Sequence, residues 1–288
     1  MESSQFPFST PSPVQKLTVL PELDLYIKRD DLIHPVVSGN KWRKLQGFFD
    51  TLPAGQSIIT FGGPHSNHLP AAAFAAKFLG HPITGIVRGD ELNAASNAHL
   101  AYCQQQGMPL HFIARSTYRE LRNTGWQISS EMRAQWGATD AHLLPEGGAG
   151  DHAMRGCGAI WHELKGANFD HLVLASGTGT TAQGILKAMP ENSKTRVHVV
   201  SAVKGAQREC AAVEAAAQSK GIDLHWEDDP HFGGFGKWTP ELMALKTQFE
   251  SATGIAIDLN YNAKVLAYLH RTQLSGKVLW LHTGGVSF

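Results

Sequence analysis

Ala175-Ser176-Gly177-Thr178-Gly179-Thr180-Thr181 directly follows the apolar run His171-Leu172-Val173-Leu174. This order predicts a strand that enters a glycine loop and continues into a helix over residues 182–189. Such a loop presents free backbone N–H groups, hydroxyl donors and the positive end of a helix dipole to one small volume. The stretch therefore predicts a phosphate-binding site.

Apolar strand-like runs alternate with amphipathic helical runs along the chain of 288 residues. The strand-like runs are residues 57–61, 83–87, 110–113, 171–174, 196–203, 255–259 and 278–281. The helix-like runs include residues 71–79, 94–106, 119–136, 207–220 and 240–252. This alternation predicts an α/β fold in which helices cover both faces of parallel sheets. In such open sheets, binding sites lie at the carboxyl ends of the strands.

Charge and cysteine content restrict the class of partner and the compartment. The 25 basic and 25 acidic residues give a net charge of zero, which argues against a nucleic acid or an anionic membrane surface as the main partner. No apolar run is long enough to span a bilayer, and the N-terminus lacks the pattern of a signal peptide. Cys103, Cys157 and Cys210 are far apart and odd in number, so we expect a reducing, cytoplasmic location.

The loop that starts at Ser176 differs from two common nucleotide-binding loops. It lacks the Gly-Lys-Ser/Thr ending of an NTPase P-loop, and so offers no dedicated Mg²⁺ ligand or phosphate lysine. It also departs from Gly-x-Gly-x-x-Gly, because a third glycine comes only at Gly184. A small monophosphate therefore fits better than a di- or triphosphate. Binding of a phosphosugar or a nucleotide is the alternative.

Lys41 lies in the motif Ser38-Gly39-Asn40-Lys41-Trp42-Arg43-Lys44-Leu45, which predicts a helix with Ser38 as its N-cap. The lysine would then occupy the first turn, where the helix dipole disfavours a cation. Disfavouring the ammonium lowers the pKa of the lysine and prepares a nucleophilic amine. The alternative interpretation is a surface lysine on an amphipathic helix.

Polar side chains also follow two other predicted strands. Ser66-Asn67-His68 precedes the predicted helix over residues 71–79, where Ser66 could serve only as an N-cap. Tyr261 follows the predicted strand over residues 255–259, so its hydroxyl would face the strand-end cleft. An ordinary buried tyrosine is the alternative. His65 and His68 are three residues apart without a third ligand, so we expect no metal site.

Seven motifs occur in one order over nearly the whole chain: Lys28-Arg29-Asp30-Asp31, Ser38-Gly39-Asn40-Lys41-Trp42-Arg43-Lys44-Leu45, Gly62-Gly63-Pro64-His65-Ser66-Asn67-His68, Pro145-Glu146-Gly147-Gly148, Ser176-Gly177-Thr178-Gly179-Thr180-Thr181, Asp258-Leu259-Asn260-Tyr261 and His282-Thr283-Gly284-Gly285. This ordered set resembles the pyridoxal-phosphate enzymes of fold type II. It is most similar to the family of 1-aminocyclopropane-1-carboxylate deaminases and D-cysteine desulfhydrases.

The resemblance implies pyridoxal 5'-phosphate as the cofactor. Lys41 would carry it as a Schiff base, and Ser176 with the loop from Gly177 to Thr181 would hold its phosphate. Asn67 would hydrogen-bond the phenolic oxygen, and Thr283 would face the pyridine nitrogen. A threonine leaves that nitrogen unprotonated more readily than an aspartate does. The electron sink is then milder, which suits elimination over transamination.

The resemblance also implies a small amino acid as the substrate. Ser66, Asn67 and His68 would bind its carboxylate, assisted by the amides of the helix that follows. Lys41, Tyr261 and Ser66 would be the catalytic residues. Tyr261 would act near the substrate as an acid, a base or a positioning group.

The family resemblance further implies a tryptophan-synthase-β-like architecture of two domains with open twisted sheets. Residues 1–44 and 143–288 would form the large cofactor-binding domain, and residues 45–142 the small domain. The cleft between them would be the active site. The family suggests a homodimer.

Two positions that face the substrate depart from the family pattern. Phe235 stands where the family usually has the tyrosine of Gly-Tyr-Gly, and Asn262 stands where the deaminase-type members have an acid. These departures favour β-elimination, as in D-cysteine desulfhydrase, which gives pyruvate and ammonia. The alternatives are 1-aminocyclopropane-1-carboxylate deamination to 2-oxobutyrate and ammonia, and a protein that binds the cofactor without robust turnover.

Overall fold

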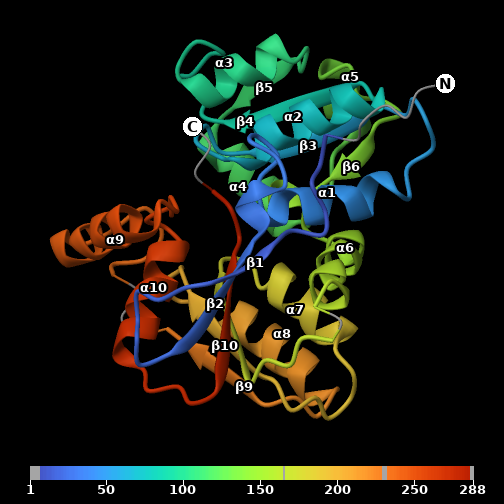
Figure 1. Cartoon of the computed structure of the whole chain (residues 1–288). Coiled ribbons are helices and arrows are strands. Elements are labelled where there is room, and N and C mark those ends of the chain that lie inside the picture. Colours follow the sequence, from blue (N-terminus) through green and yellow to red (C-terminus); the bar gives the residue numbers. More distant parts are fainter. Residues whose placement is uncertain (1–6, 165, 229–231, 286–288) are drawn as a thin grey trace.

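The computed structural model describes residues 7–164, 166–228 and 232–285, which contain two β-sheets (Figure 1). The larger sheet has the strand order β1 (Val14–Lys16), β2 (Asp24–Arg29), β10 (Lys277–His282), β7 (His171–Ser176), β8 (Arg196–Ser201) and β9 (Leu224–Glu227). The smaller sheet has the order β5 (Leu110–Ile113), β4 (Ile83–Arg88), β3 (Ile58–Gly62) and β6 (His142–Leu144). All these pairings are parallel except that of β1 with β2. The predicted α/β fold with parallel sheets is confirmed.

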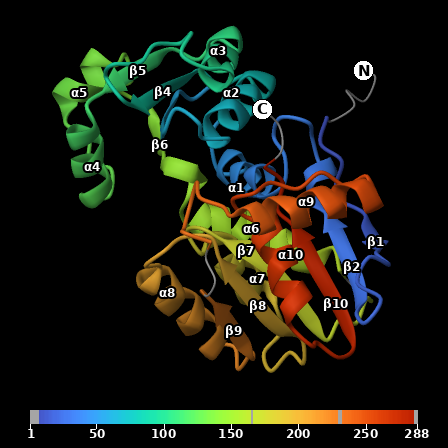
Figure 2. The ribbon, with the colours of Figure 1, turned by 90° about the vertical axis from the view of Figure 1, so that its left-hand side faces the viewer.

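The α-helices of the described residues are α1 (Asn40–Phe49), α2 (His68–Leu79), α3 (Ala98–Gln105), α4 (Arg115–Asn123), α5 (Ser130–Gln135), α6 (Asp151–His162), α7 (Thr180–Ala188), α8 (Gln207–Gln218), α9 (Pro240–Thr253) and α10 (Asn262–Arg271). Short 3₁₀ turns are η1 (Asp30–Leu32) and η2 (Glu146–Gly148). In Figures 1 and 2 the two sheets lie at opposite ends of the molecule, with α1 between them.

Neighbouring residues of a strand point to opposite faces of its sheet, and both faces of each sheet are covered by helices. In the larger sheet, Leu172 and Leu174 pack with residues of α6, α7 and α8, whereas Val173 packs with residues of α9 and α10. The smaller sheet follows the same rule. Ile58 packs toward α1, α2 and α3, and Ile59 toward α4.

A buried ionic cluster fixes α1 to the larger sheet. The Arg43 guanidinium donates to Asp30 (Nη2–Oδ1 2.9 Å) and to Glu163 (Nη2–Oε2 2.8 Å). The ammonium of Lys28 also donates to Glu163 (2.6 Å). Arg43 and Lys28 are each 1% exposed, so two cations and two carboxylates neutralise one another in the interior.

Two secondary-structure predictions are wrong. Residues 255–259 form no strand, although Ile255 and Ile257 alternate into the core, because their backbone amides bond to side chains instead. The amide of Ile257 donates to Glu250 Oε1 (2.8 Å) and that of Ile255 to Thr253 Oγ1 (3.1 Å). The single helix predicted over residues 119–136 divides into α4 and α5, with the left-handed Gly125 (φ 69°) between them.

The described ranges contain neither a candidate membrane span nor a candidate metal-binding cluster. No helix in them is both long enough and apolar enough to cross a bilayer. No group of three or more His, Cys, Asp or Glu side chains in them is arranged to hold a metal ion.

The buried cluster yields a prediction about stability. Arg43→Met leaves the Asp30 carboxylate without its cation and Glu163 with Lys28 alone, so the free energy of unfolding should fall by about 3–5 kcal/mol. Urea unfolding followed by circular dichroism measures this change. Lys16→Met is the matched control, because its ion pair with Asp24 (2.8 Å) is exposed, and it should leave the transition almost unchanged. Equal effects of the two substitutions would contradict the assignment of Arg43 as an anchor.

Candidate active site

Two glycine-containing loops leave the same edge of the larger sheet. Strands β7 and β10 are parallel neighbours, with Leu174 opposite Leu281. The loop after Ser176 and the loop after His282 therefore start side by side. Both start at carboxyl strand ends, where α/β proteins bind their ligands.

The loop after β7 has the predicted strand–loop–helix form, although its helix starts at Thr180, two residues earlier than expected. Gly179 precedes the helix with φ 72°, a conformation that favours glycine. Its amide donates to Ser176 Oγ (3.1 Å), and no side chain caps the helix. The first amides of α7 are thus open to an anion.

Lys41 lies in the first turn of α1, as predicted, but Ser38 is not the N-cap. The N-cap is Gly39, and the Ser38 hydroxyl instead donates to the Asp31 carbonyl (3.3 Å). A Cβ on Gly39 would lie only 1.9 Å from the carbonyl oxygen of Thr283. This close approach, together with φ 62°, explains the glycine and joins the helix start to the Thr283 loop.

Asn40 connects Lys41 to the start of α7, a contact that was not predicted from the sequence. Its Oδ1 accepts from Lys41 Nζ (2.8 Å), and its Nδ2 donates to Thr181 Oγ1 (3.3 Å). The Cys157 thiol also lies close to the Thr181 hydroxyl (Sγ–Oγ1 3.9 Å). The sequence indicated a role for Asn40 only by its position directly before Lys41.

Lys44 is a second missed residue. It lies three residues after Lys41 on the same helix, a spacing that places both on one face. Its side chain is buried, and among the described residues its ammonium forms no hydrogen bond or salt bridge. Burial lowers its pKa, and the nearby Cys157 partly opposes this. Among the described residues, no carboxylate therefore neutralises Lys44.

The pKa of Lys41 is lowered to about 7. Burial is the main cause and the charge of Lys44 is the second, while Asp258 opposes both. The lowered pKa expected from the sequence is confirmed, but its main cause is desolvation rather than the helix dipole. A pKa near 7 makes the uncharged amine of Lys41 accessible near neutral pH.

Tyr261 lies over the glycine loop between β7 and α7. A Cβ on Gly177 would come within 3.1 Å of the Tyr261 hydroxyl. The tyrosine is positioned by Asp258, whose Oδ1 accepts from its backbone amide (2.6 Å). Burial, and secondly the charge of Asp258, raises the pKa of Tyr261 to about 12, so its hydroxyl stays protonated near neutral pH.

Asn262 joins α10 to the loop that follows β10. Its Nδ2 donates to Asp258 Oδ2 (2.7 Å) and to the carbonyl of Gly284 (3.0 Å). The side chain is fully buried. Both donors of the amide are therefore used to hold together the two loops that carry Tyr261 and Thr283.

The Ser66-Asn67-His68 segment forms the start of α2, which begins at His68, three residues earlier than predicted. Ser66 Oγ accepts from the His68 amide (3.2 Å), but Asn67 is the N-cap residue. The His68 ring is buried and hydrogen-bonds Thr60 Oγ1 (2.8 Å), while its Nδ1 has no partner. Burial, and then the charges of Lys41 and Lys44, lowers the pKa of His68 to about 3.

These electrostatic effects indicate that the start of α2 faces Lys41 from the smaller sheet. No hydrogen bond within the described residues joins Ser66 or Asn67 to Lys41 directly. The predicted residues thus come from α1, the start of α2, the segment from the end of β7 to the first residues of α7, the start of α10 and the loop after β10, and Phe235 comes from the segment between β9 and α9.

Phe235 lies at the edge of this group and is 57% exposed. Its ring is 5.7 Å from that of Tyr261. The neighbouring Gly234 carbonyl accepts from the buried Lys264 ammonium (2.9 Å), which also donates to Ala202 (3.0 Å). The aromatic side chain is therefore presented to solvent beside Tyr261 on an anchored loop.

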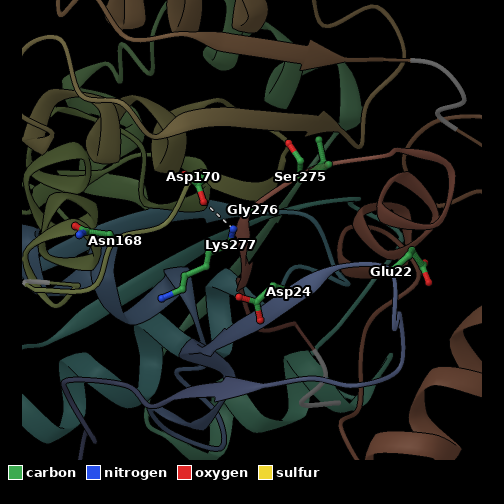
Figure 3. A pocket seen from close by; sticks show the side chains of 8 residues that line it. Glu22, Asp24, Asn168, Asp170, Ser275, Gly276 and Lys277 are labelled. Carbon is green, nitrogen blue, oxygen red and sulfur yellow. Dashed lines mark hydrogen bonds between the residues drawn. The ribbon is translucent and has the colours of Figure 1, made fainter.

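A hollow of about 450 Å³ lies at the opposite edge of the larger sheet (Figure 3). Its walls include Asp24, Asp170 and Lys277, which stand at or before the amino ends of their strands. Asp170 is used internally, since its Oδ2 accepts from the Lys277 amide (2.7 Å). This hollow does not belong to the group around Lys41.

Comparisons with known proteins agree with this geometry. The family described as "Pyridoxal-phosphate dependent enzyme" matches residues 6–284. A protein of Pyrococcus abyssi named "Putative 1-aminocyclopropane-1-carboxylate deaminase" is 30% identical over 285 residues, covering 92% of this chain and 85% of the relative. A mitochondrial bifunctional D-cysteine desulfhydrase/1-aminocyclopropane-1-carboxylate deaminase of Arabidopsis thaliana is 26% identical, covering 96% of this chain and 76% of the relative.

A solved structure supports the same grouping. The crystal structure of an ACC deaminase homologue matches with a TM-score of 0.79 and 26% identity, covering 98% of this chain and 93% of that one. The resemblance inferred from the seven motifs is thereby confirmed. The chain belongs to the pyridoxal-phosphate dependent enzymes of fold type II, in the family of 1-aminocyclopropane-1-carboxylate deaminases and D-cysteine desulfhydrases, and its cofactor is pyridoxal 5'-phosphate.

Proposed function

We propose that this protein is a lyase that eliminates the β-substituent of a small amino acid, in the manner of a D-cysteine desulfhydrase, and releases pyruvate and ammonia. The observation that carries the proposal is the Lys41 amine. Its pKa is about 7, and Asn40 links it to the phosphate-binding loop beneath Tyr261. Such an amine can form a covalent bond to an aldehyde and exchange protons near neutral pH.

The charges around the loop fit a phosphate. The uncapped start of α7 offers backbone amides, and the buried Lys44 ammonium has no carboxylate partner among the described residues. In the proposal, Ser176 and the residues from Gly177 to Thr181 hold the phosphate, Lys44 neutralises it, Asn67 donates to the phenolic oxygen and Thr283 faces the ring nitrogen. When bound, the cofactor supplies an electron sink for the substrate α-carbon.

Two proton-transfer roles follow from the different pKa values of Lys41 and Tyr261. Lys41 can be an uncharged amine near pH 7, so it is suited to take the α-proton. Tyr261 keeps its proton, so it is suited to donate a hydrogen bond to the departing β-substituent. Ser66, Asn67 and the backbone at His68 would bind the substrate carboxylate, and Phe235 would cover the substrate from the solvent side.

Asn262 favours elimination over cyclopropane ring opening. An asparagine supplies no carboxylate to the substrate, and the two donors of this amide are committed to Asp258 and Gly284. The second candidate function is 1-aminocyclopropane-1-carboxylate deamination to 2-oxobutyrate, because the relatives described above carry that activity in their names. The third candidate is a protein that binds the cofactor without robust turnover.

The proposal also covers the division into domains, the oligomeric state and the compartment. We propose residues 45–142 as the small domain and residues 1–44 and 143–288 as the large one. The strands of the two sheets divide near these boundaries, but the first boundary falls within α1 and the second within β6, a strand of the smaller sheet. A homodimer and a cytoplasmic location complete the proposal.

The lowered pKa of Lys41 can be measured on the protein without cofactor. Trace acetylation followed by mass spectrometry should show Lys41 reacting with a midpoint near pH 7, so that labelling falls about tenfold per unit below it. Lys44→Met removes a neighbouring positive charge and should raise the midpoint. Lys16, whose pKa is raised by Asp24, is the control and should react only at alkaline pH. A Lys41 midpoint equal to that of Lys16 would refute the proposed amine.

The reaction is tested by adding D-cysteine, L-cysteine and 1-aminocyclopropane-1-carboxylate to the holoenzyme and identifying the keto acid released. We expect pyruvate and sulfide from D-cysteine. Lys41→Ala should lower turnover by about 10²–10⁴-fold, the scale of losing a general base. Lys187→Ala, at the exposed end of α7, is the control and should keep full activity. Release of 2-oxobutyrate would favour the second candidate, and a coloured holoprotein without turnover would favour the third.

A further inference from the structure

The His99 side chain lies against Asn67, although the two residues are on different helices. His99 is in the first turn of α3, and its Nε2 is 2.9 Å from Asn67 Oδ1 at the start of α2. The family motifs gave His99 no role. We propose that His99 is a positioning residue that holds the Asn67 amide with its Nδ2 directed to the phenolic oxygen of the cofactor; this inference rests on the proposed function.

The direction of this hydrogen bond follows from the chemistry of the two groups. A carbonyl oxygen only accepts, so the Nε2 atom of His99 carries the proton and donates. The Asn67 side chain then has its oxygen engaged, and its two N–H donors remain for another acceptor. A phenolate oxygen requires such a donor. Without His99 the amide could rotate by half a turn and present its oxygen, which would repel the phenolate.

α3 provides a rigid support for His99. Asn97 caps the helix by accepting from the Leu100 amide (3.0 Å), and its Nδ2 donates to the Pro64 carbonyl in the loop before Asn67 (3.1 Å). Leu100 and Cys103 are fully buried and fix the helix in the core around α2. Two hydrogen bonds thus join α3 to the segment that leads into α2. Asn97 bonds the backbone of Pro64, and His99 bonds the side chain of Asn67.

The charge state of His99 suits this role. Burial, and secondly the neighbouring His65, lowers the pKa of His99. The two rings meet edge to face with their centroids 6.2 Å apart. The lowered pKa favours the uncharged ring, which orients the amide without placing a cation beside the phenolate.

The test is a pH titration of the visible absorbance of the holoprotein, which reports the proton shared between the cofactor and Lys41. His99→Leu should raise the titration midpoint by about one unit, because the form without the proton loses a hydrogen bond to its charged oxygen. His99→Gln can still donate to Asn67, so its midpoint should lie close to that of the wild-type protein. Gln104→Leu, an exposed position on the same helix, should leave the midpoint unchanged.

An unchanged midpoint in a folded His99→Leu holoprotein would overturn the inference while leaving the proposed function intact. If the wild-type protein shows no Lys41-dependent visible band, the proposed function fails and the inference fails with it. A second measurement needs no variant. The ¹H–¹⁵N NMR spectrum of the holoprotein should show His99 protonated on Nε2, and protonation on Nδ1 alone would also overturn the inference.

Discussion

The ion pair between Arg43 and the carboxylates of Asp30 and Glu163 is the constraint on which the site depends. Arg43 is two residues from Lys41 on α1, and its partners belong to η1 and to the residue that follows α6. Removing these charges from water is costly, and the cost is recovered only in one geometry, with the hydrogen bonds of Lys28 completing the set. The cluster therefore fixes both the position and the rotation of the helix that carries Lys41.

With α1 fixed, the parallel strands bring the remaining groups to it. Because β7 and β10 are in register, the glycine loop before α7 and the Thr283 loop leave the sheet together. Gly39 lets α1 approach the Thr283 carbonyl, and Asn40 then reaches Thr181. Asn262 holds the Tyr261 helix against the same edge. Each of these contacts restricts the conformations of a loop before any ligand binds. Ligand binding then costs less conformational entropy.

The electrostatics of the site follow from burial more than from any single charge. Lys41 and Lys44 share one helix face in a region with little water, so the ammonium form of Lys41 is disfavoured. The same desolvation keeps Tyr261 protonated and His68 neutral. Burial thus favours the uncharged amine of Lys41 and the neutral phenol of Tyr261, the two states that the proposed proton transfers require.

The sequence by itself determined the α/β fold, the glycine loop before α7, the first-turn position of Lys41 and the family. These features depend on apolar periodicity, glycine and short motifs, which act within a few residues. It predicted a strand over residues 255–259 and an N-cap at Ser38, because local pattern does not reveal which partners the backbone finds. Only the tertiary structure decided that Asn40 bonds Thr181, 141 residues away, and that His99 orients Asn67. Such contacts arise when separate elements pack together, and no spacing along the chain encodes them.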